Sequence, residues 1–443
     1  MKSYKSCVFC IALWLTLGTS SLLSQAALLL GEPYSYDGEF AGTGHAAVHL
    51  ARVCAETPTH LRRCEAGEQG VVISRYHGVA GHDWMAIPLI PYLYAVRTSE
   101  DVPLYVNPKL VVFLREQYIS SLPLPAEAHP GDEPRYELAG SAYDRTIYGF
   151  RIATRPEQDD ALIRLLNSSP NEEAYKLVSR NCADFAKQII NFYYPHAIHR
   201  SIIADLGVTT PKQAAKSLVH FSEHHREMQL TTFVIPQVPG LKRSKPVHGV
   251  IESLVLAKKY VTPVLLFHPF LVGGVEVAYW AGWRFNPGKN ALVFNASAGN
   301  PMKDFDPPLT ATQRRSYAGL IATVRKSEEL DDFPTWHHLQ SDAKPQLDAE
   351  GRPFLQVLFD GREVPVGICR GNALRIAGSP ELVQHLLLTH LDAELKVKNP
   401  RVSEQSVKSD WKLLESAREA SRASLANGTD LKGPGTLTRN SEY

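Results

Sequence analysis

Cys182 stands at a position where proteins make a cysteine reactive. It opens the run 182–194, in which apolar residues recur at helical spacing at Phe185, Ile189 and Phe192 or Tyr193. Asn181 is expected to cap this helix. Unpaired amides and the positive end of the helix dipole favour a thiolate over a thiol there. The pattern predicts nucleophilic attack by sulfur, and the alternative is an inert buried cysteine.

A cysteine nucleophile needs an imidazole within hydrogen-bond reach and a third group that orients the imidazole. The segment 44–50 alternates as a strand does, with His45, Ala47 and His49 on one face. His45 is therefore a candidate base for Cys182, contributed by a strand far upstream of the helix.

The composition is that of a globular protein, with 44% hydrophobic and 21% charged residues in 443. A net charge of +1 without a clustered basic face argues against nucleic acid as a partner. No spacing of cysteines or histidines matches a zinc motif, and thiol hydrolysis requires no organic group. We therefore expect neither a metal nor a cofactor.

Residues 1–26 have the pattern of a secretory signal peptide. Lys2 and Lys5 precede an apolar stretch over 7–17, and small residues at 24–26 suit cleavage, so the mature chain is expected to begin near Ala27. An uncleaved membrane anchor is the alternative. The expected location is the periplasm or cell envelope.

Export changes how the remaining cysteines are interpreted. Cys54 and Cys64 bracket a short polar segment that a disulfide can close in an oxidising compartment. Cys182 then stays free unless it pairs with Cys369, and the sequence leaves that rival disulfide open.

The chain after the signal peptide divides into four expected regions. They are an α+β domain at 31–194, a helical and apolar connecting region at 195–285, an α+β region at 286–395, and a charged helix with a disordered tail at 396–443. Strands are expected around 44–50, 70–76, 103–106, 148–154 and in a hairpin at 353–369, and helices at 157–167, 182–194, 213–228, 311–325 and 380–395.

The most apolar internal segment, 261–283, is long enough to cross a bilayer. It carries His268, Glu276, two prolines and a Gly-Gly pair, which favour buried or membrane-surface structure over a span.

The histidine strand and the cysteine helix together resemble a known family. Gly44-His45-Ala46-Ala47-Val48, followed much later by Asn181-Cys182-Ala183-Asp184-Phe185, is similar to the circularly permuted branch of the NlpC-type papain-like hydrolases, which includes lecithin retinol acyltransferase-like enzymes. The resemblance covers about 31–194. It implies an antiparallel sheet packed on the cysteine helix, with Cys182 as nucleophile and His45 as base.

In that branch the third polar residue sits on the strand after the histidine strand, which here points to Ser74, Tyr76 or His77. His49 and Asn181 are candidates to line the pocket. The expected activity is hydrolysis of an amide bond in a cell-wall peptide, or secondly of a lipid ester or amide, through a Cys182 thioester. The competing expectations are a non-catalytic envelope interaction protein and a membrane protein anchored through 261–283.

Overall fold

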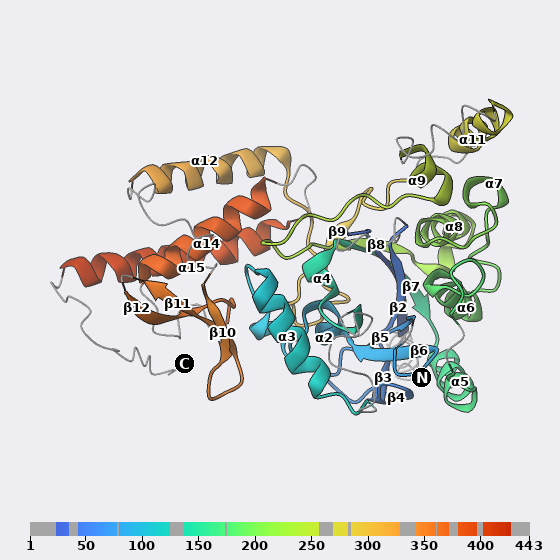
Figure 1. Cartoon of the computed structure of the whole chain (residues 1–443), viewed down its shortest axis with the longest axis horizontal. Helices are drawn as coiled ribbons and strands as arrows, with labels where there is room; N and C mark the ends of the chain where they lie inside the picture. Colours follow the sequence, from blue (N-terminus) through green and yellow to red (C-terminus); the bar gives the residue numbers. More distant parts are fainter. Residues whose placement is uncertain are drawn as a thin grey trace, which may run out of the picture.

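Within the residues that it describes, the computed structural model is built on a seven-stranded sheet (Figure 1). The described residues are 24–34, 43–77, 79–124, 137–172, 175–256, 269–281, 285–327, 342–359, 361–371, 380–396 and 402–426. The strand order is β6-β5-β2-β1-β7-β8-β9, antiparallel except at the β8–β9 pair. The strands are β1 (Ser24–Gly31), β2 (His45–Leu50), β5 (Val71–Arg75), β6 (Trp84–Pro88), β7 (Ile147–Thr154), β8 (Thr231–Ile235) and β9 (Leu292–Val293).

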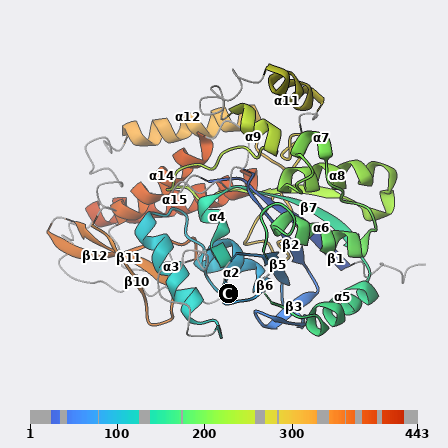
Figure 2. The ribbon, with the colours of Figure 1, turned by 45° about the vertical axis from the view of Figure 1, so that its right-hand side comes forward.

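Helices cover both faces of the sheet (Figures 1 and 2). One face packs against α5 (Pro156–Ser168), α6 (Cys182–Tyr193) and α8 (Pro211–His224), and the other against α2 (Leu89–Tyr94), α3 (Pro108–Ser120) and α4 (Ser141–Asp144). Because successive side chains of a strand point to opposite faces, a strand between two helical layers must be apolar throughout. The antiparallel sheet against the cysteine helix confirms the expected α+β class.

Strand β1 is the clearest case of this double burial. Leu28 and Leu30 enter the core on the α6 side, and Ala27 and Leu29 enter the core on the opposite side. The cleavage position expected near Ala27 lies inside this strand, and the sheet begins before the expected domain boundary at residue 31. An apolar run after a signal sequence and a buried central strand look alike in sequence. A cleavage that leaves β1 whole has to lie before Ser24, and export itself stays a prediction.

The region 286–395 contributes to more than one apolar cluster. Its three-stranded sheet, β10 (Lys344–Leu347), β11 (Pro353–Phe359) and β12 (Arg362–Gly367), contributes to the same apolar cluster as α2 and α3. The expected hairpin at 353–369 is thus present, with its strands at β11 and β12. The expected strand at 103–106 is reduced to an isolated bridge between Pro103 and Cys369.

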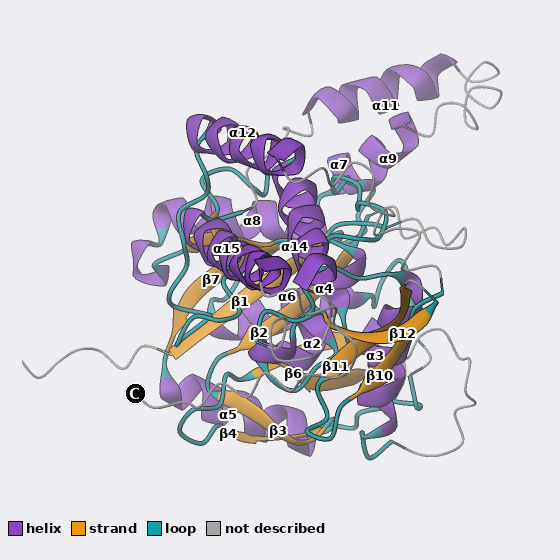
Figure 3. Ribbon diagram, turned by 90° about the vertical axis from the view of Figure 1, so that its left-hand side faces the viewer, coloured by secondary structure: helices purple, strands orange, loops and turns teal. Residues whose placement is uncertain are grey.

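Three helices form a further layer at the carboxyl end: α12 (Ala311–Ser327), α14 (Pro380–Leu395) and α15 (Glu404–Ala426), shown in Figure 3. The charged helix expected after residue 396 is present as α15, and one side of it is packed, since Val407, Leu414 and Ala417 are fully buried. Asp410 of α15 is buried too and bonds His390 of α14 at 3.0 Å. The tail at 427–443 lies outside the described residues.

The smaller elements join or flank these layers. They are β3 (Val53–Thr57), β4 (His60–Arg63), α7 (Ile202–Asp205), α9 (Val250–Leu256), α11 (Pro269–Ala281) and the 3-10 turns Ser99–Asp101 and Arg226–Met228. Of the apolar segment 261–283, the part at 269–281 is α11, which packs on α7 and α9 (Figure 1). None of the described helices is both long and apolar enough to cross a membrane.

A substitution of Gly149 on β7 tests how closely β7 and β8 pack. A Cβ at this position would lie 2.0 Å from the ring of Phe233, its buried partner on β8. Gly149→Ala is therefore expected to destabilise the protein by about 1–3 kcal/mol through overpacking. Urea unfolding measures this, with Gly319→Ala as the control, because Gly319 lies in a helix with nothing within 4 Å of the added atom. Equal stability of the two variants would contradict the close β7–β8 packing.

Candidate active site

The start of α6 is held by its own cap. The Asn181 side chain accepts a hydrogen bond from the Asp184 amide at 2.9 Å, and the Asp184 carboxylate accepts one from the Asn181 amide at 3.3 Å. The Asn181 side-chain nitrogen donates to the carbonyls of Leu177 and Thr209. The predicted cap is confirmed. With both ends of its side chain bonded to backbone, Asn181 positions Cys182 and is not a pocket residue.

Two ion-pair networks that the sequence did not reveal anchor this helix. Arg75 of β5 is 2% exposed, makes a two-point contact with Asp83 at 2.7 and 2.8 Å, and lies over the ring of Phe185 on α6. On the other side, Asp184 accepts from Arg200 at 2.8 Å and from Thr209 at 2.6 Å. A buried charge is tolerated when it is paired in this way. The networks fix the cysteine helix relative to the sheet.

The Cys182 thiol lies against the first residues of β2. It is 9% exposed, and the amide of Ala46, the neighbour of His45, donates a hydrogen bond to its sulfur. Burial nevertheless raises the pKa of Cys182 to about 11, and the amides of Ala46 and Ala183 offset this only in part. The expectation of a thiolate prepared by the helix start is therefore not met, because desolvation outweighs the local amides.

His45 is oriented by Ser74. The Ser74 hydroxyl donates to the Ala46 carbonyl at 2.8 Å and lies 2.9 Å from Nε2 of His45. Since the one hydroxyl proton is engaged, the network assigns the imidazole proton to Nε2, which donates to Ser74. Nδ1 is then the basic nitrogen. Burial, with a smaller effect of the Arg145 charge, lowers the pKa of His45 to about 3.

The other candidates for the third position lie elsewhere around the ring. Tyr76 is buried and stacks on His45 with a centroid distance of 5.4 Å. His77 is exposed and contacts the ring of Tyr175. Of the three residues named from the resemblance, the structure thus puts Ser74 in hydrogen-bond contact with His45. His49, the second pocket candidate, is fully buried, and its Nε2 is hydrogen-bonded to the Gln69 carbonyl at 2.8 Å. Its role in this position is to stabilise the fold.

The thiol and the imidazole are neighbours without a mutual hydrogen bond among the described contacts. The Ala46 amide reaches the sulfur, and His45 precedes Ala46 on the same strand. The lowered pKa of His45 and the raised pKa of Cys182 both favour neutral groups. Catalytic hydrogen bonds are often longer before substrate binds, so this geometry suits a base that acts as the substrate is attacked.

The remaining cysteines are accounted for. Cys54 and Cys64, the pair suggested by the sequence, form a disulfide that joins β3 to the residue after β4. Cys369 is a buried thiol that donates to the Asp101 carbonyl at 2.9 Å. Cys182 is a free thiol, so the rival disulfide between Cys182 and Cys369 is absent.

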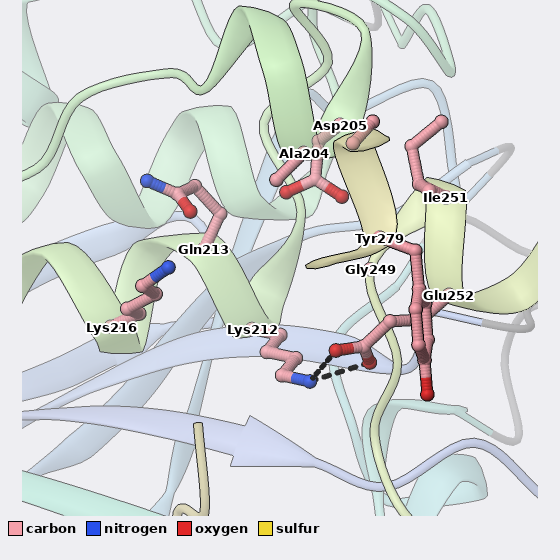
Figure 4. A pocket seen from close by; sticks show the side chains of 10 residues that line it. Ala204, Asp205, Lys212, Gln213, Lys216, Gly249, Ile251, Glu252 and Tyr279 are labelled. Atoms are coloured by element: carbon pink, nitrogen blue, oxygen red, sulfur yellow. Dashed lines mark hydrogen bonds and ion pairs between the residues drawn. The ribbon is translucent and has the colours of Figure 1, made fainter. Parts of the chain in front are cut away.

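A small cavity of about 20 Å³ lies away from this site, between α7, α8, α9 and α11 (Figure 4). The charged side chains that line it pair with each other: Lys212 donates hydrogen bonds to both carboxylate oxygens of Glu252. The cavity contains no residue of the cysteine and histidine site.

Comparison with known proteins adds little to this geometry. No protein-family model matches the sequence, and no curated protein matches it significantly. Among solved structures, a type VI secretion system effector, TseH, is similar over 49% of this chain and 95% of its own, at 15% identity and a TM-score of 0.25. A TM-score this low supports no argument about fold or activity.

The titration of Cys182 can be tested directly. With a pKa of about 11, only about one thiol in ten thousand is ionised at pH 7, so alkylation by iodoacetamide should be slow there and accelerate toward pH 10. His45→Ala should leave the rate at pH 7 unchanged, because the resting thiol is not ion-paired. Mass spectrometry locates the label, and Cys182→Ser is the control. Fast labelling below pH 8 that His45→Ala abolishes would contradict this site description.

Proposed function

We propose that this protein is a thiol hydrolase of the permuted papain-like type, with Cys182 as nucleophile and His45 as base. The observation that carries the proposal is the combination of a free thiol at a helix start with a strand imidazole whose Nε2 bonds Ser74. This arrangement leaves Nδ1 of His45 as the basic nitrogen on the strand that contacts the thiol. The papain-like assignment rests on the residue pattern and this geometry.

The neutral resting pair implies the order of steps. Nδ1 of His45 accepts the thiol proton as the Cys182 sulfur attacks the acyl carbon, so a thiolate need not accumulate beforehand. The carbonyl oxygen takes the negative charge, and backbone amides at the helix start stabilise it. His45 then gives its proton to the leaving amine or alcohol. A water, deprotonated by His45, attacks the thioester carbon and the C–S bond breaks. The acid is released, and the Cys182 sulfur takes the proton back from His45.

For the substrate, we place amide bonds of cell-wall peptides first and lipid esters second, in a protein exported to the periplasm or cell envelope. The disulfide between Cys54 and Cys64 supports an oxidising compartment. No organic cofactor or metal takes part in the proposed steps.

The second candidate function is a non-catalytic envelope interaction protein that keeps the fold. The observations in its favour are the low exposure of Cys182 and the missing hydrogen bond between its thiol and His45 among the described contacts. The experiment below distinguishes the two functions.

The test measures amine release from a cell-wall peptide and acid release from a lipid ester. Cys182→Ala should abolish activity, and His45→Ala should lower kcat by about 10²- to 10⁴-fold because the base is lost. Ser74→Ala should lower it by about 3- to 10-fold, the value of one hydrogen bond, with recovery in Ser74→Thr. Cys369→Ser is the matched cysteine control and should be fully active. No turnover and no trapped thioester on either substrate would favour the interaction protein.

We further propose contact with a membrane surface through α7 and α11. Exposed apolar side chains gather on these two packed helices: Ile202 at 80%, Phe270 at 94% and Trp280 at 72%. Contiguous exposed apolar groups that include tryptophan are typical of membrane-surface sites.

Binding to phospholipid vesicles tests this contact. The double variant Phe270→Ala and Trp280→Ala should co-sediment with vesicles about 10-fold less than the unmodified protein, because it loses two apolar anchors. Leu358→Ala is the control, since Leu358 is a similarly exposed apolar residue on β11 at 56%. Equal binding of all three proteins, or none, would contradict the proposal.

A further inference from the structure

Arg145 is a buried cation without a hydrogen-bond partner among the described residues. The side chain is 6% exposed, its Nε has no partner, and it forms no ion pair with a described carboxylate. Its described contact is with an aromatic face, since the guanidinium carbon lies 4.2 Å from the ring centre of Tyr34. Burying a charge without a partner is costly, so a protein that keeps one gains something else from it.

The sheet places this arginine beside the candidate catalytic pair. Gly31 of β1 pairs with His45 on one side and with Ile147, two residues after Arg145, on the other. A Cβ on Gly31 would lie 2.7 Å from the Arg145 Cδ, so the arginine side chain occupies the space that this glycine leaves open. The Arg145 charge acts on both His45 and Cys182.

A second polar group of the same site lacks a partner. The hydroxyl of Tyr76, whose ring stacks on His45, is buried and bonds no other group. The Tyr76 hydroxyl and Arg145 interact electrostatically with each other and with Cys182. The Arg145 Nε and the Tyr76 hydroxyl are thus both unbonded and both interact electrostatically with Cys182, whereas most buried polar groups in proteins are hydrogen-bonded.

We propose that the Arg145 guanidinium binds a carboxylate group of the acyl substrate, next to the bond that Cys182 attacks. This inference rests on the proposed function and narrows its substrate to acyl compounds that carry a free carboxylate near the scissile bond. A guanidinium presents paired donors that match the two oxygens of a carboxylate. Tyr76 supplies a further donor from the His45 side.

The charge around Arg145 favours a singly charged group. Burial lowers the pKa of Arg145, but Tyr34, Glu137 and Asp144 outweigh it and raise the pKa above its usual value. Asp144 is already paired with Arg115. Among the described residues, Arg145 is the cation that acts on both catalytic groups. A doubly charged phosphate monoester would meet one cation and a neighbouring acidic residue, whereas a carboxylate is neutralised by Arg145 alone.

The first experiment measures binding without turnover. N-acetylalanine should raise the Tm of the unmodified protein, whereas N-acetylalanine amide and inorganic phosphate should not, and Arg145→Gln should abolish the shift. Circular dichroism should show that Arg145→Gln remains folded, so that loss of the shift reports loss of binding. A shift with phosphate alone, no shift with any probe, or an unchanged shift in folded Arg145→Gln would each overturn the proposal.

The second experiment uses a peptide substrate with a free carboxylate and the same peptide with that group amidated. Arg145→Gln should raise KM for the free acid by about 10- to 100-fold relative to its effect on the amidated peptide, as expected for loss of a charged hydrogen bond, and any change in kcat should be shared by the two peptides. Arg145→Lys should restore part of the loss, and the exposed Arg362→Gln is the control. Equal effects on both peptides would overturn the proposal. Carboxylate binding at Arg145 without any turnover would instead refute the hydrolase and leave the anion site standing.

Discussion

The hydrogen bonds that β1 makes along both of its edges fix the candidate site. β1 lies between β2 and β7, and its register sets Gly31 opposite His45 on one side and Ile147 on the other. Because Gly31 has no side chain, the Arg145 chain passes over it and approaches the imidazole. Three residues that are remote in sequence become neighbours through one strand. The two helical layers depend on the same strand, since both apolar cores use its side chains.

Two buried arginines have different roles in this fold: one stabilises the packing of the cysteine helix, and the other lies beside the candidate catalytic residues. Arg75 and Arg145 are both almost fully buried. Arg75 is neutralised by Asp83 and holds β5 against α6. Arg145 faces a tyrosine ring and forms no hydrogen bond or ion pair with a described residue, although two acidic residues, Glu137 and Asp144, lie near it. Both residues are arginines and both are almost fully buried. The difference between their roles therefore follows from whether an ion pair neutralises the charge.

Short, local patterns were sufficient for part of this structure. The 3.6-residue period after Cys182 and the Asn181 cap predicted α6, and the alternation around His45 predicted β2. The turn at 360–362 predicted the β11–β12 hairpin. These features depend on residues close together in sequence, where spacing carries the information.

What escaped prediction depends on distant partners. The expected signal-peptide boundary after residue 26 cuts through β1, because only the pairing with β2 and β7 shows that 24–31 is a central strand. The pKa of Cys182 was misjudged because local amides are visible in a sequence and desolvation is not. Arg75, Asp83 and Arg145 have no local motif, and their roles appear only once the sheet is assembled.

The central place of β1 has a consequence for how the chain folds. A ribosome delivers β1 first among the described strands, yet its two neighbours include β7, which is made much later. Until β7 is available, one edge of β1 is uncovered, and the face toward α6 stays uncovered until α5, α6 and α8 have also been made. Non-local pairing of this kind slows folding and exposes strands that aggregate readily. A chain with this topology completes its core late, after most of the polypeptide has been synthesised.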